Sequence, residues 1–140
     1  MSGSLLLDTP FVVGLLNRHD QHHLKAREIL LRVRSASRVL ITEAVLVEIG
    51  NFLSAIPHRG AAASFIKGCY NGAEQNFQVV KTDKDLIERS LKFYEERPDK
   101  SWGLTDCISF VVMNENQTTD AVTTDNHFAQ AGYRALMAET

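Results

Sequence analysis

The amino-acid sequence predicts an α/β fold, a three-layer α/β/α sandwich around a mostly parallel sheet of four or five strands. Short apolar runs alternate along the chain with longer segments of helical period, the order that produces a parallel sheet with right-handed crossovers. Two of these runs, 5–7 and 120–124, end directly on an acidic residue. The length of 140 residues predicts one domain, 1–140, without a linker or internal repeat.

The composition is that of an ordinary globular protein, with 44% hydrophobic and 23% charged residues. The net charge of −2 gives no general basic signature, so nucleic-acid binding would need a local basic patch or metal ions. Cys69 and Cys107 lack C-x-x-C spacing, which argues against zinc and favours packed thiols in a reducing compartment. No signal peptide and no run of 18 apolar residues is present, so we expect a cytoplasmic protein without a membrane segment.

The first strand, Leu5–Leu7, stops at Asp8, and a helix follows at once. We expect Thr9 to cap this helix with its hydroxyl and Pro10 to take the first helical position, where its missing N–H costs nothing. Apolar residues at helical spacing continue the helix to about Asn17. Asp8 would then lie at the carboxyl end of a buried strand, where the binding sites of open α/β sheets are found. The alternative is that Asp8 only stabilises the start of the helix through a favourable interaction with the helix dipole.

A second helix is expected from a cap at Asp20 to about Ser35. Its outer face is basic, and such a face is either solvated or a contact surface for nucleic acid. The basic residues of this face are Lys25, Arg27, Arg32 and Arg34.

The middle of the chain predicts a strand at Val39–Thr42 and a helix from Glu43 that Pro57 ends. Glu48 lies within this largely apolar helix, so its carboxylate needs a partner, a solvated edge or a cation. A further helix is expected over 61–70, opened by Gly60.

The remaining elements complete the alternation of strands and helices. The third strand is expected at Phe77–Val80, and a helix capped by Thr82 or Asp83 ends before Pro98. After a loop comes an apolar helix, Leu104–Met113, with Asp106 in its first turn. The fourth strand, 120–124, ends on Asp125; a short helical turn and an edge strand at 133–137 follow.

Four acids of this arrangement are expected to share one cleft. Asp8 and Asp125 follow strands, and in a parallel sheet all carboxyl ends lie along the same edge. Asp106 starts a helix at that edge, and Glu48 lies about a turn into the helix after the second strand. None has an evident basic partner nearby in the sequence.

Clustered carboxylates repel one another, so these four either take up protons or hold cations. An all-oxygen site selects Mg²⁺ or Mn²⁺ rather than zinc, and two such ions suit in-line attack at a phosphodiester. Thr9 and Thr124 are candidate donors that orient the carboxylates, although capping and strand packing explain them equally well. Asn126 could also reach the cleft.

The chain resembles the PIN-domain ribonucleases, including the VapC-type toxins of bacterial toxin–antitoxin pairs. The resemblance runs from Leu5 to about Leu136 and rests on the order and spacing of short motifs. These are Leu7-Asp8-Thr9, the segments 20–26 and 42–48, Trp102 to Phe110, and Thr123-Thr124-Asp125-Asn126-His127-Phe128.

The resemblance implies a PIN-like fold and a metal-dependent endoribonuclease in which Asp8, Glu48, Asp106 and Asp125 hold Mg²⁺ or Mn²⁺. It also implies an RNA substrate, a homodimer and a cognate antitoxin that places a basic side chain in the acidic cleft. One position departs from the family: many relatives carry a serine where Gly103 stands. The lost hydroxyl would affect the entry to the Asp106 helix or a water near the metal.

Other site classes fit the sequence less well. An aspartate-nucleophile phosphatase needs an acid where Pro10 stands, and a receiver domain needs a late lysine, whereas none follows Lys100. His19 and His23 have zinc-compatible spacing but no third ligand. Tyr70, Trp102 and Phe110 could form a stacking platform for bases, although core packing suits Phe110 better.

The main alternative is a non-catalytic module that binds RNA or protein on the same fold. It would use the basic second helix or the helix at 61–70. The four acids argue against it, because a surface that only binds RNA would not collect carboxylates.

Overall fold

The computed structural model describes residues 3–138 and contains a five-stranded sheet in the order β3-β2-β1-β4-β5, in which every strand pairing is parallel. The first two and last two residues of the predicted domain, 1–140, lie outside this description. The elements are β1 (Ser4–Leu7), α1 (Thr9–Leu16), α2 (His23–Ser35), β2 (Arg38–Thr42), α3 (Glu43–Phe52), α4 (Ile56–Asn71), β3 (Phe77–Val80), α5 (Lys84–Glu96), α6 (Leu104–Glu115), β4 (Asp120–Val122), α7 (Asn126–Gln130) and β5 (Arg134–Ala135).

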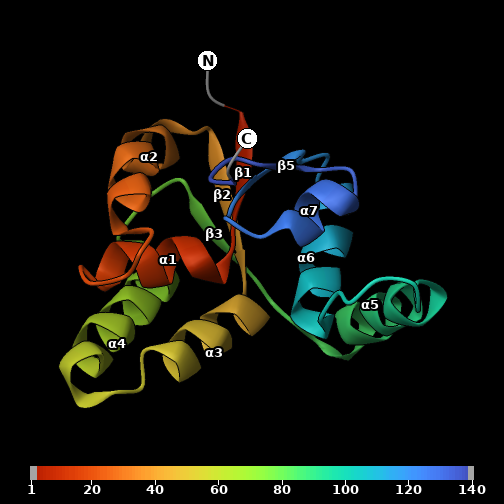
Figure 1. Ribbon diagram of the computed structural model, residues 1–140, viewed down its shortest axis with the longest axis horizontal. Coiled ribbons are helices and arrows are strands. Elements are labelled where there is room, and N and C mark those ends of the chain that lie inside the picture. The colour runs from red at the N-terminus through yellow and green to blue at the C-terminus, as the bar shows by residue number, and fades with distance from the viewer. Residues whose placement is uncertain (1–2, 139–140) are drawn as a thin grey trace.

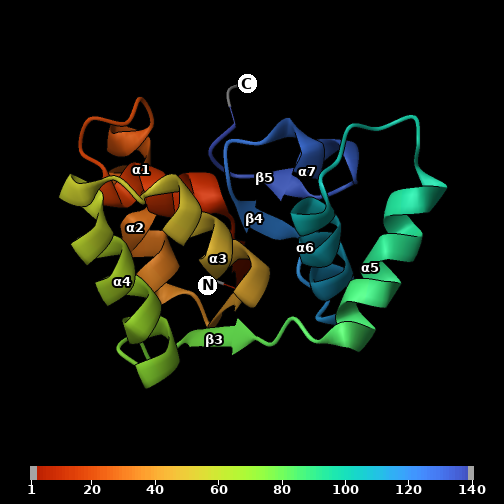
Figure 2. The same cartoon turned by 90° about the horizontal axis from the view of Figure 1, so that it is seen from below.

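Helices cover both faces of the sheet, which confirms the predicted three-layer α/β/α sandwich. Helices α1 to α4 lie on one side, and α5 to α7 lie on the other (Figure 1). The view from below separates the same two groups, with α3 and α6 facing each other across the middle (Figure 2). No helix among residues 3–138 is long and apolar enough to cross a membrane.

The two central strands are apolar over Leu5–Leu7 and 39–41 because both of their faces are buried there. Successive side chains of a strand point to opposite faces. Leu5 and Leu7 therefore pack into the core under α1 to α4, whereas Leu6 packs into the core under α6 and α7. Strand β2 divides in the same way, since Ile41 joins the first core and Leu40 the second. The resulting rigidity fixes the position at which each strand ends.

The predicted starts of the first two helices are wrong. Asp8, not Thr9, is the N-cap of α1, which places Pro10 in the first turn but one residue later than expected. Helix α2 begins at His23, and Asp20 instead accepts a hydrogen bond from the backbone N–H of His22 at 2.9 Å. Short polar side chains that can cap a helix equally well stabilise a turn before it, which is the role Asp20 has.

The helix expected from Glu43 to Pro57 is also wrong at its end. Helix α3 ends at Phe52, and Pro57 lies in the first turn of α4, a position that tolerates the missing N–H. Gly60 lies inside α4 rather than opening it. Strands β4 and β5 are shorter than expected: β4 ends at Val122, and β5 contains only Arg134 and Ala135. Of the two candidate caps before α5, Asp83 is the one that binds, accepting from the Leu86 N–H.

Candidate metal centre

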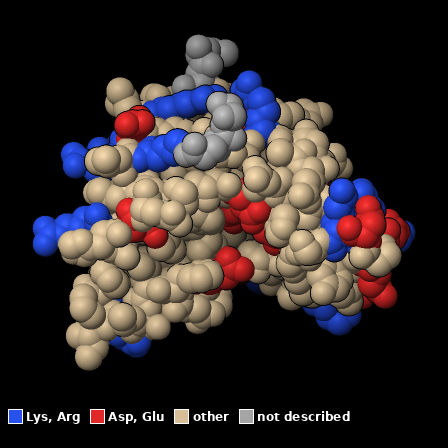
Figure 3. All heavy atoms as spheres, viewed as in Figure 1, with Lys and Arg blue, Asp and Glu red and all other residues tan. Residues whose placement is uncertain are grey.

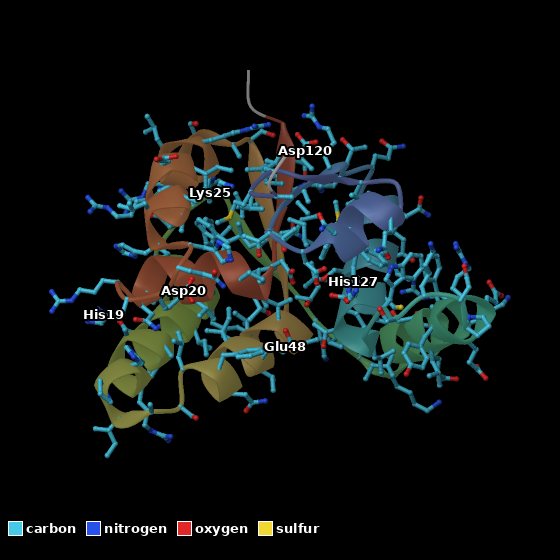
Figure 4. The ribbon with its side chains drawn as sticks, in the orientation of Figure 1. His19, Asp20, Lys25, Glu48, Asp120 and His127 are labelled. Carbon is cyan, nitrogen blue, oxygen red and sulfur yellow. The ribbon has the colours of Figure 1, made fainter. Side chains whose placement is uncertain are left out.

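A pocket of about 400 Å³ opens at the carboxyl edge of the sheet and contains all four predicted acids. Asp8, Glu48, Asp106 and Asp125 line it together with Asp20 and apolar side chains of α1 and α3. Asp and Glu side chains gather in the central hollow of the face drawn in Figure 3, while Lys and Arg side chains lie around its periphery. Glu48 on α3 and His127 on α7 both lie near the centre of this view (Figure 4). The structure therefore brings together residues separated by more than a hundred positions in the sequence.

Asp8 is the most buried of the four acids, with 3% of the residue exposed. Its backbone N–H donates to the Val122 carbonyl at 3.3 Å, which ties the end of β1 to the end of β4. Its Oδ2 accepts from the Thr123 hydroxyl at 2.8 Å. Burial is the main cause that raises the pKa of Asp8 from 3.8 to about 7. The hydrogen bond from Thr123 opposes this rise, whereas the nearby charges of Asp106 and Asp125 add to it.

Asp106 lies in the first turn of α6, as predicted, and its Oδ2 accepts from the backbone N–H of Gly103 at 3.2 Å. Burial raises its pKa, and the contact with His127 opposes that rise. The site at Gly103 is spacious, because a Cβ added there would meet only Asp106 Oδ2, at 3.9 Å. A serine, the residue many relatives carry at this position, would therefore fit without moving the acid.

Asp125 caps α7, since its Oδ1 accepts from the His127 N–H at 2.8 Å. The same turn carries the imidazole of His127 back to the acids. Its Nδ1 lies 2.9 Å from Asp106 Oδ2 and 3.4 Å from Asp125 Oδ1. The expectation that the acids lack a basic partner close in sequence is therefore wrong for Asp125. The sequence did contain an indication of this contact, because His127 lies only two residues after Asp125, the N-cap of α7.

Glu48 lies in the second half of α3 and lines the pocket. Its Oε1 accepts from the Thr9 hydroxyl at 2.6 Å. The Thr9 hydroxyl thus holds a carboxylate rather than capping a helix, which is the orienting contact that the sequence suggested as one of two options.

The second predicted donor lies one residue away from the contact that the structure shows. Thr123, not Thr124, supplies the hydroxyl to Asp8, and this hydroxyl also accepts from the Asp125 N–H at 3.0 Å. Among the described residues, the Thr124 hydroxyl makes no hydrogen bond to the four acids. Asn126, the first residue of α7, is exposed.

Neither the aromatic platform nor the zinc site suggested by the sequence forms among the residues that the structure describes. Trp102 and Phe110 are buried and pack against one another and Phe93, so they offer no stacking platform. His23 contacts the Gly14 carbonyl through Nδ1 at 2.8 Å, whereas His19 points away from the pocket (Figure 4).

Comparison with known proteins agrees with this fold. The PIN domain family matches residues 5–132. This chain belongs to the PIN domain family. No curated protein matches it significantly. Its fold is similar to the crystal structure of VapC20 from Mycobacterium tuberculosis, a toxin that cleaves the sarcin–ricin loop, with a TM-score of 0.82, 21% identity, and coverage of 94% of this chain and 98% of that one. It is also similar to VapBC2 from Rickettsia felis bound to a DNA fragment from its promoter, with a TM-score of 0.60, 15% identity, and coverage of 91% and 92%.

The residues of this PIN-domain pocket fit a divalent cation. Asp106, Asp125 and His127 each present one ligand atom, and these atoms lie within 4.8 Å of one another. Carboxylate oxygens are the donors that Mg²⁺ and Mn²⁺ prefer, so the aspartates are the expected ligands and His127 is a neighbouring group. Among the ion pairs between described residues, no Lys or Arg pairs with any of the four acids. The negative charge of the pocket therefore calls for a cation from solution.

Proposed function

We propose that this chain is a metal-dependent endoribonuclease and the toxin of a type II toxin–antitoxin pair. The single observation that carries the proposal is the convergence of Asp8, Glu48, Asp106 and Asp125 in one pocket, where no Lys or Arg among residues 3–138 forms an ion pair with them. Carboxylates that only stabilise a fold are paired, as Asp120 is with Arg134. The membership of the PIN family and the similarity to a toxin that cleaves RNA support the same reading.

In this proposal Asp8, Asp106 and Asp125 hold Mg²⁺ or Mn²⁺, with Glu48 completing the site from α3. The bound metal would activate water and neutralise charge at a phosphodiester. The protein contributes orientation: the Thr9 hydroxyl fixes Glu48, and the Thr123 hydroxyl joins Asp8 to the backbone of Asp125. Such contacts hold carboxylates in place when their mutual repulsion would separate them.

The proposed partners follow from the same assignment. We expect an antitoxin that places a basic side chain in the acidic pocket, as the similarity to the VapBC2 assembly suggests, and a homodimer of this chain. We expect the protein to act in the cytoplasm, where its RNA substrate is found and where its two buried free thiols stay reduced.

The test is cleavage of single-stranded and structured RNA with Mn²⁺ or Mg²⁺, with DNA of the same sequence run in parallel. We expect cleavage of RNA that chelation abolishes and that Asp106→Asn lowers by more than about a hundred-fold, beyond the usual effect of residues that only orient ligands. Asp120→Asn, at the far end of the sheet, serves as the matched control and should keep activity.

Three outcomes contradict the proposal. Cleavage that survives chelation or is unchanged in Asp106→Asn excludes the acidic pocket as the active centre. Preferential cleavage of DNA reassigns the substrate. RNA binding without cleavage in either metal favours the alternative, a non-catalytic RNA- or protein-binding module on the same fold.

A further inference from the structure

Phe52 is an exposed aromatic residue at the mouth of the acidic pocket. The sequence has seven phenylalanines. Six of them pack into one of the two cores: Phe11, Phe65, Phe77, Phe93, Phe110 and Phe128. Phe52 is 69% exposed, and it lines the pocket with the four acids. Single exposed apolar residues are common on proteins, so its location rather than its exposure carries the argument.

The position of Phe52 on α3 sets its relation to Glu48. The two residues are four apart on one helix, so they share a face and lie about one turn, roughly 5.4 Å, from each other. Glu48 is held in the acidic part of the pocket by Thr9. Phe52 is the last residue of α3, where the helix gives way to the turn before α4.

The pocket lining therefore combines two kinds of side chain. The carboxylates attract cations, whereas Phe52, Pro10 and Val13 are apolar. A phosphate does not bind the apolar side chains. An aromatic ring offers a flat surface on which any nucleobase can stack, and stacking of this kind needs no particular base.

We propose that Phe52 is the residue on which a nucleobase next to the scissile phosphate stacks. This inference rests on the proposed nuclease function and names a substrate-binding residue of the same site. A base within a duplex has both faces covered by its neighbours, so it must leave the stack before it can contact Phe52. Because Phe52 lies about one turn of α3 from Glu48, a nucleotide whose phosphate lies at the acids can place its base against the ring.

The test measures binding separately from cleavage. Short single-stranded RNAs carrying 2-aminopurine at successive positions are titrated with protein in Ca²⁺, an oxygen-seeking cation that can occupy a carboxylate site. With wild-type protein we expect quenching at one position. Phe52→Ala should lose that quenching and bind about 5- to 100-fold more weakly, the range for loss of one stacked base. Phe52→Tyr should retain both properties.

Two controls isolate the aromatic ring. Phe52→Leu keeps an apolar side chain without a stacking face and should behave like Phe52→Ala. Val47→Ala changes another exposed residue of α3, 64% exposed and outside the acidic pocket, and should bind as the wild type does. Removing the base at the quenched position should weaken binding to the wild type but not further weaken binding to Phe52→Ala, since both changes delete the same contact. Thermal melting confirms that each variant is folded.

Several results would overturn the inference. These are unchanged RNA binding in Phe52→Ala, wild-type binding in Phe52→Leu, or a wild type that binds duplex RNA as tightly as single strands. A change of self-association in Phe52→Ala with RNA binding intact would assign the ring to a contact between copies of the chain. Quenching that depends on Phe52, together with cleavage that Asp106→Asn leaves unchanged, would show that Phe52 stacks a base but that cleavage takes place elsewhere, so the proposed function would fail on its own evidence. A wild type that binds no RNA rejects both.

Discussion

Two aspartates on neighbouring strands, at opposite ends of the sheet, show how this fold separates structural from functional charge. Asp120 begins β4 and Asp8 follows β1, its hydrogen-bonded neighbour. Asp120 accepts two hydrogen bonds from Arg134, at 2.7 and 2.8 Å, and one from Arg32 at 3.1 Å. Asp8 is more deeply buried and has a hydroxyl as its side-chain partner.

The pKa values of the two carboxyls move in opposite directions. The Arg134 guanidinium lowers the pKa of Asp120, and Arg32 adds to the effect. Burial and two neighbouring acids raise the pKa of Asp8 to about 7. Figure 4 shows Asp120 at the end of the sheet away from Glu48 and His127. Arg32 belongs to the basic face of α2, so part of that face pairs with an acid of the same chain and does not serve as a contact surface for nucleic acid.

The largest predicted effect is on the pH dependence of stability, measured without metal ions. Between pH 3.8 and about pH 7 the folded chain keeps a proton on Asp8 that the unfolded chain releases. The contribution of Asp8 to the free energy of unfolding therefore falls as the pH rises. Asp8→Asn removes this penalty. The variant should match the wild type near pH 4 and exceed it by at most about 4 kcal/mol at pH 8.

Asp120→Asn is the opposite case. Because the pKa of Asp120 is lower in the folded chain than in the unfolded chain, this carboxylate stabilises the fold at pH values above its unfolded-state pKa. That stabilisation is lost as the pH falls through the folded-state pKa. Because Arg134 and Arg32 are 70% and 45% exposed, the expected cost at pH 7 is only about 1 kcal/mol. Urea unfolding of both variants from pH 4 to 8, with a chelator, gives the two slopes. Parallel slopes would show that the two ends of the sheet do not differ in this way.

The Thr123 hydroxyl is predicted to have the next largest effect, since it occupies the place that guanidinium groups take at Asp120. Thr123→Val keeps the shape of a fully buried side chain but removes hydrogen bonds to Asp8 and Asp125. We expect a stability loss of about 1–3 kcal/mol and a fall in RNA cleavage of about 10- to 100-fold. Thr124→Val is the matched control and should change neither. A larger effect at Thr124 would reinstate the prediction from the sequence.

These threonines show where sequence reasoning reaches its limit. The convergence of Asp8, Asp106 and Asp125 was predictable, because each lies at a strand end or a helix start and a parallel sheet aligns those points. The donor to Asp8 was not, because the choice between Thr123 and Thr124 depends on where β4 ends. One residue of difference turns a side chain to the other face.

Two other features of the pocket required tertiary structure for different reasons. His127 reaches Asp106 because α7 turns directly after Asp125, and the 21 residues separating the two partners hide the contact. Phe52 reaches the mouth of the pocket because α3 ends there, whereas the sequence suggested a helix continuing to Pro57. Proline reliably marks a boundary, but it is tolerated in the first turn of a helix as well as after its end.

His127 provides the third test, because its imidazole is the basic group that the acidic end of the sheet does contain. Without metal, His127→Ala removes contacts to Asp106 and Asp125 and should lower the free energy of unfolding by about 1 kcal/mol. Millimolar Mn²⁺ should shrink this difference, since the cation takes over the neutralisation of both acids. Melting of both proteins with and without Mn²⁺ decides the point. A difference that grows with Mn²⁺ would instead identify His127 as a metal ligand.

The smallest predicted effect concerns Gly103, the departure from the family at the entry to α6. Its backbone has φ −74° and ψ 165°, an extended N-cap conformation that serine adopts freely. The hydroxyl of Gly103→Ser would accept a hydrogen bond from a first-turn N–H, raising stability by only a few tenths of a kcal/mol and the melting temperature by about 1–2 °C. Because Asp106 already accepts from the Gly103 N–H, its position should not change, and cleavage should stay within about two-fold of the wild type. A gain in cleavage of about ten-fold would mean that the missing hydroxyl belongs to the active centre. The acidic end of the sheet would then depend on a hydroxyl that this chain lacks, whereas Asp120 at the other end is already paired with Arg134.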